Sequence, residues 1–237
     1  MDFLMAKNKT SIIFLHAALG VQKDLASLMN IFQDKGFETY SFDFSGHGTT
    51  SVESKEFRID QFARDLDTFI QRKELQNPVI FGHSMGGYVA LYHKANFEDS
   101  PISKIFTYGT KFNWSEKSLS KELPLLNPDY LKEKYPSQVE ILKAKHGDGW
   151  RQLLLSTAHM MQHLEKLDGL SKEDLESIDI PVMLILGDQD RVVTTEETST
   201  INSFLKFGSM KTISHSKHEL ERSNLKEIAE MIIQNID

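Results

Sequence analysis

The chain of 237 residues contains no cysteine. Disulfides, thiolate metal sites and a cysteine nucleophile are therefore excluded, and any catalysis must use oxygen and nitrogen groups. No apolar run approaches the roughly 18 residues that a membrane-spanning helix requires. We therefore expect a cytoplasmic protein with no membrane insertion.

Clusters of basic residues are also missing. The chain has 27 Lys and Arg residues against 34 Asp and Glu residues, which gives a formal net charge of −7. Because nucleic-acid binding needs a cationic surface, nucleic acid is not an expected partner. The length suits one α/β domain with an insertion, which can bury a core without disulfides or metals.

Short apolar runs alternate with amphipathic helical patterns along most of the chain. Continuous apolar strands separated by helices are typical of a parallel sheet that is covered on both faces. We therefore predict an α/β fold with a mostly parallel sheet of about six strands and helices on both faces. The expected strands span residues 12–15, 37–44, 79–81, 102–108, 181–186 and 210–214.

One segment interrupts this alternation, because residues 110–170 show helical patterns without a convincing strand. Asn127-Pro128 is expected to start one helix, and Ser137, with Glu140 three residues later, to cap a second. An insertion that follows the C-terminal end of a strand lies at the edge where ligands bind in such sheets. We therefore predict a helical cap at residues 110–170 on a core of residues 1–109 and 171–237.

A third expected helix in this cap begins near Trp150 and has an apolar face. A small cap has little core of its own, so some of its large apolar side chains should face the cleft. Trp150 and Met161 are our candidates for the substrate pocket.

Residues 78–87, PVIFGHSMGG, combine an apolar strand, the pattern Gly-x-Ser-x-Gly and the start of a helix. The strand and helix leave no room for a loop, so Ser84 must occupy a sharp turn at the edge of the sheet. Gly82 and Gly86 allow the flanking backbone to approach closely. Ser84 is therefore a candidate nucleophile. The alternative is a plain glycine-rich turn, and a base and an acid elsewhere in the chain would favour the nucleophile.

A serine nucleophile needs a base, and the base needs an acid that orients it. His215 and His218 follow the last expected strand in one loop. Asp188 and Asp190 follow the preceding strand. The residues alone do not show which histidine is the base or which aspartate is the acid.

The order Ser, Asp, His along the chain resembles that of the α/β-hydrolase superfamily. The resemblance covers nearly the whole chain and rests on the segments FLHAALG, FDFSGHGTT, GHSMGG, GDQDRVV and SHSKHELE. By position in these motifs, it implies that Asp190 is the acid and His215 the base. It also implies an oxyanion hole formed by the backbone N–H groups of Ala18 and Met85, next to Ala17, where the family usually has glycine.

The remaining histidines have simpler explanations. His16 and His83 are candidates for the pocket lining, together with Ala17, although a hydrogen-bonded structural role is favoured for both histidines. His159 and His163 are four residues apart on a predicted helix, but no zinc-protease carboxylate pattern accompanies them. We expect no metal and no cofactor.

These features predict a serine hydrolase that cleaves an ester or a related activated acyl compound through an acyl-enzyme. The apolar residues of the cap favour a small-molecule substrate with an apolar acyl group. A carbon–carbon bond hydrolase, a cofactor-free lyase and a ligand receptor without turnover are the alternatives. Serine at position 84 argues against the dehalogenase and epoxide-hydrolase branches, which by resemblance use aspartate there.

Overall fold

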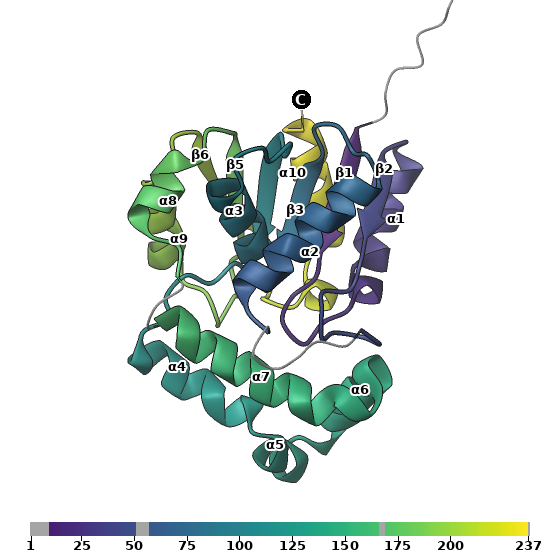
Figure 1. Ribbon diagram of the computed structural model, residues 1–237, viewed down its shortest axis with the longest axis vertical. Coiled ribbons are helices and arrows are strands. Elements are labelled where there is room, and N and C mark those ends of the chain that lie inside the picture. Colours follow the sequence, from purple (N-terminus) through teal and green to yellow (C-terminus); the bar gives the residue numbers. More distant parts are fainter. Residues whose placement is uncertain (1–9, 51–56, 166–168, 237) are drawn as a thin grey trace, which may run out of the picture.

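The computed structural model describes residues 10–50, 57–165 and 169–236, and its centre is a six-stranded sheet (Figure 1). The strand order is β2-β1-β3-β4-β5-β6, and every neighbouring pair is parallel. The prediction of a parallel sheet of about six strands is confirmed. The strands are β1 (Ser11–Leu15), β2 (Glu38–Ser41), β3 (Val79–His83), β4 (Lys104–Tyr108), β5 (Val182–Gly187) and β6 (Gly208–Ile213).

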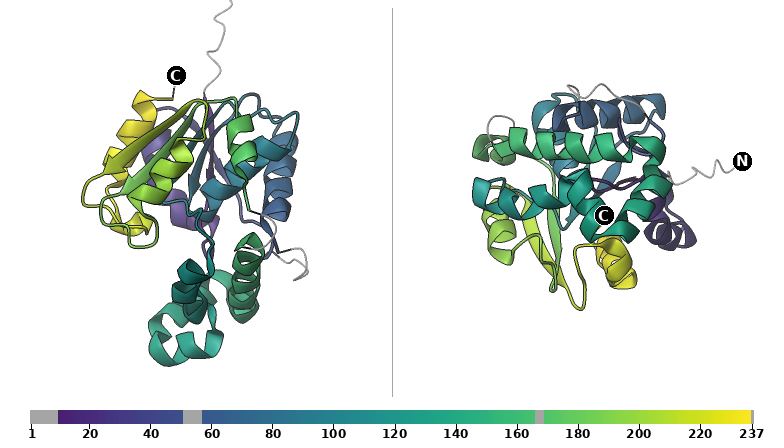
Figure 2. Two further views of the ribbon diagram at one scale, coloured as in Figure 1. Left: turned by 90° about the vertical axis from the view of Figure 1, so that its left-hand side faces the viewer. Right: turned by 90° about the horizontal axis from the view of Figure 1, so that it is seen from below.

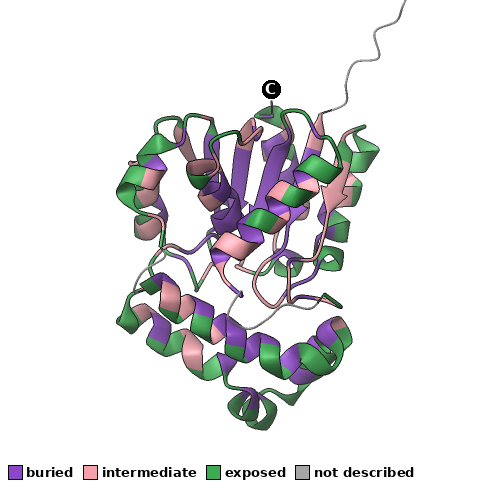
Figure 3. Ribbon diagram, in the orientation of Figure 1, coloured by how far each residue is buried: buried purple, intermediate pink, exposed green. Residues whose placement is uncertain are grey.

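The side chains of the central strands point alternately into two hydrophobic clusters, one on each face of the sheet. In β1, Ile12 and Phe14 belong to one cluster, whereas Ile13 and Leu15 belong to the other. Figure 3 shows these strands as the most buried part of the molecule. Burial on both faces is the reason why the strands read as continuous apolar runs.

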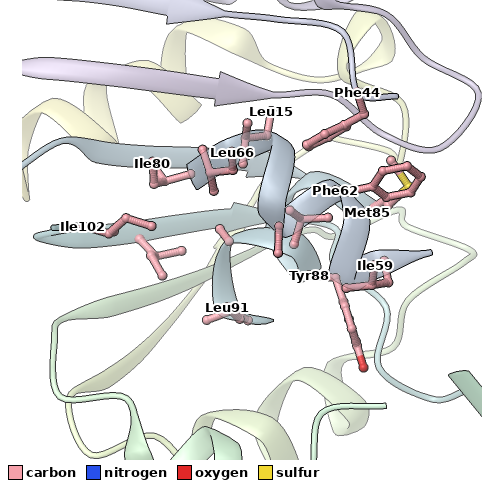
Figure 4. Close-up of a cluster of buried hydrophobic side chains, with 14 of the residues drawn as sticks. Leu15, Phe44, Ile59, Phe62, Leu66, Ile80, Met85, Tyr88, Leu91 and Ile102 are labelled. Carbon is pink, nitrogen blue, oxygen red and sulfur yellow. The ribbon is translucent and has the colours of Figure 1, made fainter. Parts of the chain in front are cut away.

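Helices cover both faces of the sheet, as the left view of Figure 2 shows. One face is covered by α1 (Ala26–Asp34) and α10 (Leu225–Gln234). The other is covered by α2 (Ile59–Arg72), α3 (Met85–Asn96), α8 (Lys172–Ser177) and α9 (Thr195–Asn202). Figure 4 shows part of the hydrophobic cluster on this latter face, where α2 and α3 pack on β1 and β3.

A helical layer, defined here as helices α4 to α7, lies beyond the C-terminal ends of the strands, below the sheet in Figure 1. Its helices are α4 (Glu116–Glu122), α5 (Pro128–Lys134), α6 (Pro136–His146) and α7 (Trp150–His163). The layer has a hydrophobic cluster of its own, formed by Leu126, Leu131, Val139, Leu142, Trp150 and Leu154. The expectation that it would have little core is therefore wrong.

Two local predictions about this layer have different outcomes. Asn127 caps α5 as expected, because its side chain accepts the N–H groups of Asp129 and Tyr130. Ser137 does not cap α6, which begins one residue earlier at Pro136. A proline at the first helical position has the φ angle that a helix needs and lacks the N–H that would remain unpaired there.

Strand β2 ends three residues before the predicted limit at residue 44. Phe42 stacks on Phe69 of α2, and Phe44 packs against Phe62 of the same helix. These aromatic contacts take the chain away from β1 after Ser41. Across the described ranges, no helix has the length and apolar character needed to cross a membrane.

Candidate active site

Ser84 lies at the junction of β3 and α3, with a φ of 50° and a ψ of −114°. A positive φ is unfavourable for a residue with a side chain, so neighbouring contacts must hold it. The N–H of Ser84 donates to the carbonyl of Tyr108 at 2.8 Å, and the hydroxyl of Thr110 donates to the carbonyl of Ser84 at 3.0 Å. Both peptide groups of this strained residue are thus fixed by the segment at the end of β4.

The glycines on either side of Ser84 are required by close backbone contacts. A Cβ at Gly82 would collide with the backbone of Gly86 and Gly87, and a Cβ at Gly86 would collide with the carbonyl of Leu15. Such overlaps cannot be relieved by rotating a side chain. The predicted reason for the Gly-x-Ser-x-Gly spacing therefore agrees with the geometry.

Ser84, His218 and Asp190 form a continuous chain of polar contacts. His218 Nδ1 lies 2.9 Å from Asp190 Oδ2, and His218 Nε2 lies 3.2 Å from Ser84 Oγ. An ionised carboxylate can only accept, so the Nδ1–H of the ring donates to Asp190 and Nε2 is left to accept the hydroxyl proton of Ser84. This is the arrangement that a serine nucleophile and its base require.

Asp190 is held as a carboxylate by its surroundings, and its side chain has no exposed surface. Burial raises the pKa of Asp190, but hydrogen bonds from His218 and from the backbone N–H groups of Val193 and Val192 outweigh burial and keep the pKa below its usual value. Its Oδ1 accepts both of these N–H groups, while Oδ2 faces the imidazole. The orientation of the carboxylate is therefore fixed from two sides.

The expectation that His215 is the base is contradicted by this geometry. His215 is exposed, whereas His218 occupies the position between Asp190 and Ser84. The reason is the path of the loop after β6. Buried Ser216 is bonded to Gln189 and Asp188 directly after β5, which anchors the loop at the sheet edge between the two histidines and leaves His215 exposed.

The structure also separates the two candidate acids. Asp188 accepts the backbone N–H of Ser216 at 3.1 Å, and hydrogen bonds from the N–H groups of Ser216 and His215 lower its pKa. Asp188 thus holds the loop that carries the histidines, while Asp190 contacts the imidazole of His218. Only tertiary contacts therefore distinguish His218 from His215. Asp188 binds the backbone of the loop, and Asp190 binds the side chain of His218.

The two expected oxyanion donors belong to residues that line the same cavity as Ser84. Met85 opens α3, so its N–H is among the first four of the helix, which have no acceptor within it. Ala18 lies in a turn after β1 that is closed by a hydrogen bond of 3.0 Å from the N–H of Gly20 to the carbonyl of Ala17. Ala18, Met85 and Ser84 line the same cavity.

This cavity, of about 660 Å³, lies between the helical layer and the sheet edge. Of the predicted pocket residues, His16, Ala17, His83 and Met161 line it. Trp150 does not line it, because its side chain is buried in the hydrophobic cluster of the layer. Other apolar side chains also line the cavity. They are those of Tyr88, Leu125, Leu126, Leu131, Ile141, Leu142, Leu164, Trp114 and Met160.

Several charged groups that line the cavity are paired. Lys111 forms an ion pair with Glu122, and Lys145 pairs with Asp24 at 2.7 Å. Lys111 also donates to the hydroxyl of Ser118. In each pair the charge of the lysine is balanced by a carboxylate.

His16 and His83 have structural hydrogen bonds, as the sequence favours. His16 Nδ1 lies 2.8 Å from the carbonyl of Ala17, and the N–H of Phe44 donates to His16 Nε2 at 3.2 Å. His83 Nε2 donates to the carbonyl of His218 at 2.8 Å. Burial lowers the pKa of each of these two histidines to about 4, so both rings are neutral at pH 7.

The depressed pKa of His16 predicts a loss of stability in acid. In the unfolded chain His16 takes up a proton below the ordinary histidine pKa of 6.5, but in the folded protein only near 4. The free energy of unfolding should therefore fall as the pH drops from 6.5 to 4, by about 3 kcal/mol from this residue. The free energy of unfolding, measured with urea at several pH values, should fall less steeply with decreasing pH in His16→Gln than in the wild type. Equal slopes for wild type and His16→Gln would refute the prediction.

His159 and His163 pack against each other with ring centres 4.8 Å apart on α7. Among the residues that the structure describes, no group of three or more His, Asp or Glu side chains is arranged to hold a metal ion.

The fold and the polar contacts at the sheet edge are those of one class of protein. In this class an α/β sheet holds a strained serine between a strand and a helix. The family model described as "alpha/beta hydrolase fold" matches residues 10–133, more than half of the chain. The chain therefore belongs to the alpha/beta hydrolase family.

Two relatives and one solved structure are similar to this chain, the solved structure in its fold. A Mycoplasma genitalium protein provisionally named esterase/lipase 2 is 32% identical over 90 residues, which are 38% of this chain and 34% of that protein. A Mycoplasma pneumoniae protein provisionally named esterase/lipase 3 is 25% identical over 91% of this chain and 82% of its own length. The esterase of Exiguobacterium antarcticum superposes with a TM-score of 0.76 at 18% identity, covering 96% of this chain and 91% of the esterase.

Proposed function

We propose that the protein is a serine hydrolase that cleaves a carboxylic ester or a related activated acyl compound. The observation that carries this proposal is the chain of contacts from Ser84 Oγ through His218 to Asp190 beside a largely apolar cavity. The relatives whose names contain esterase support the same reaction class.

In the proposed reaction, Ser84 Oγ attacks the carbonyl carbon while its proton passes to His218 Nε2. Asp190 stabilises the imidazolium that forms, and the N–H groups of Ala18 and Met85 donate to the developing oxyanion. The tetrahedral intermediate collapses when the bond to the leaving alcohol breaks and His218 returns the proton to it. The products are the free alcohol and an acyl group on Ser84.

Water completes the cycle. His218, neutral again, removes a proton from a water molecule that attacks the acyl-enzyme, and the second tetrahedral intermediate uses the same two N–H groups. The proton then returns to Ser84 Oγ as the carboxylic acid leaves. No cofactor takes part in these steps.

We further propose that residues 110–170 act as a cap on a core of residues 1–109 and 171–237. Residues 1–9, 51–56, 166–168 and 237 of these segments lie outside the described residues. The apolar side chains of the helical layer, together with the paired charges of Lys111 and Lys145, suit a neutral, apolar acyl group. A negatively charged acyl group would lose hydration there, because both lysines are already paired with carboxylates.

Hydrolysis of nitrophenyl esters of graded acyl length tests this function. The wild type should release nitrophenol far beyond one equivalent per protein, and each added methylene should change kcat/KM by at most about fourfold, which corresponds to about 0.8 kcal/mol. Met161→Ala should shift the preference towards longer acyl chains, because Met161 lines the cavity. Leu155→Ala, on an exposed position of the same helix, is the matched control.

Two results would contradict the proposal. Binding of the esters without sustained release would indicate a receptor rather than an enzyme. A chain-length profile that Met161→Ala leaves unchanged would place substrate selection outside the helical layer.

A further inference from the structure

The C-terminal end of α6 is bonded to the loop that carries Ala18. His146 is the last residue of α6, and its side chain is buried. Its Nε2 lies 3.0 Å from the carbonyl oxygen of Leu19, and its Nδ1 lies 2.9 Å from the backbone nitrogen of Gly48. One imidazole therefore bridges the helical layer to two separate loops of the core.

Only one form of the imidazole satisfies both contacts. The N–H of Gly48 can only donate, so Nδ1 must accept, and the carbonyl of Leu19 can only accept, so Nε2 must carry the proton. Burial, the largest influence, lowers the pKa of His146 and favours this neutral form. The nearby charges act in opposite directions, because Lys145 lowers the pKa whereas Asp24 and Asp43 raise it.

The carbonyl that His146 binds belongs to a strained turn. We call residues 17–20 the oxyanion turn, because they contain the Ala18 N–H and are closed by the hydrogen bond from Gly20 to Ala17. Leu19 has a φ of 60°, a conformation that is unfavourable for a residue with a side chain. Contacts from outside the turn must hold it, and His146 supplies one only two peptide units from the Ala18 N–H.

We propose that His146 is a positioning residue that holds the oxyanion turn and thereby makes correct placement of the Ala18 N–H depend on the seating of the helical layer. This inference rests on the proposed function, because the Ala18 N–H matters only if an oxyanion forms. His146 does not line the cavity around Ser84. A loosened oxyanion turn should therefore lower kcat with little change in KM, since the lost contact acts mainly in the transition state.

Two conservative substitutions separate the two hydrogen bonds of His146. In His146→Gln the side-chain amide has the length to place an N–H near the former Nε2 and to keep donating to Leu19. In His146→Asn the shorter amide can accept from Gly48, as Nδ1 does, but it falls short of Leu19. Each variant thus keeps one of the bonds, so their melting temperatures should fall by similar amounts.

The kinetic result should differ between the variants. We expect kcat of His146→Gln to stay within about threefold of wild type, and kcat of His146→Asn and His146→Ala to fall by about 10- to 100-fold, part of what the loss of an oxyanion donor costs. KM should change by less than about twofold in all three. His159→Gln removes a histidine of α7 that lies outside these contacts and should keep the wild-type kcat.

Wild-type kcat in His146→Asn would overturn the proposal, and so would an equal loss in His146→Asn and His146→Gln. A wild type that turns over no ester would instead contradict the proposed function. In that event, amide hydrogen exchange of Gly20 still tests the positioning role. Faster exchange in His146→Asn than in His146→Gln supports it, whereas equal exchange overturns it.

Discussion

Replacing Ser84 by alanine is expected to lower kcat for ester hydrolysis by about 10⁶, because nucleophile and base act as a unit and the residual rate comes from binding and the oxyanion donors alone. A fluorophosphonate, which reacts with an activated serine hydroxyl, should label the wild type and fail to label Ser84→Ala. The protein should remain folded, since the side chain of Ser84 caps no N–H of α3.

The matched control is Ser214→Ala, which removes the hydroxyl of an exposed serine in the loop after β6. It should be labelled and turn over ester as the wild type does. Labelling that survives in Ser84→Ala would mean that another residue is the nucleophile, and circular dichroism would show whether a lost signal reflects unfolding instead.

The second large effect is expected at His218. His218→Ala should lower kcat by about 10⁶, because Ser84 then has no group to take its proton. His215→Ala should change kcat by less than about threefold, since exposed surface substitutions seldom disturb a site they do not touch. The pair provides its own control, as the same substitution is made twice in one loop. Loss of activity in His215→Ala with activity kept in His218→Ala would require a different path of this loop.

The strands and the turn around Ser84 can be predicted from sequence because their causes are local. A strand buried on both faces, such as β3, appears as an apolar run, and the close approach of Gly82 and Gly86 to other backbone imposes a short spacing. Family position singles out Asp190, and the structure places this residue beside the imidazole of His218. In each case a few neighbouring residues carry the information.

The choice between His215 and His218 depends instead on contacts between distant segments. Ser216 is bonded to Asp188 and Gln189 at the end of β5, and this fixes where the loop turns. Neither histidine carries a local sign of that constraint. Family spacing favours the first of the two, and the closure of this loop on β5 brings the second one to Ser84.

The helical layer is the other region where local patterns are insufficient. An apolar helix face predicts burial, but it does not say whether the partner is the core, the cleft or a neighbouring helix. Trp150 packs within the layer, whereas Met161 lines the cavity, although both belong to the apolar side of α7. His146 carries no signal at all in the sequence, because its role comes from two loops that are far away along the chain.

The separate hydrophobic cluster of the helical layer has an evolutionary consequence. Its six buried side chains pack against one another rather than into the two clusters that flank the sheet. Substitutions among these six side chains can therefore compensate within the layer, whereas Leu153 and Met160 of α7 belong to a cluster that flanks the sheet. Under the proposed function, a lineage with this architecture can change its substrate preference through substitutions in this cluster, while the segments that hold Ser84 stay constant.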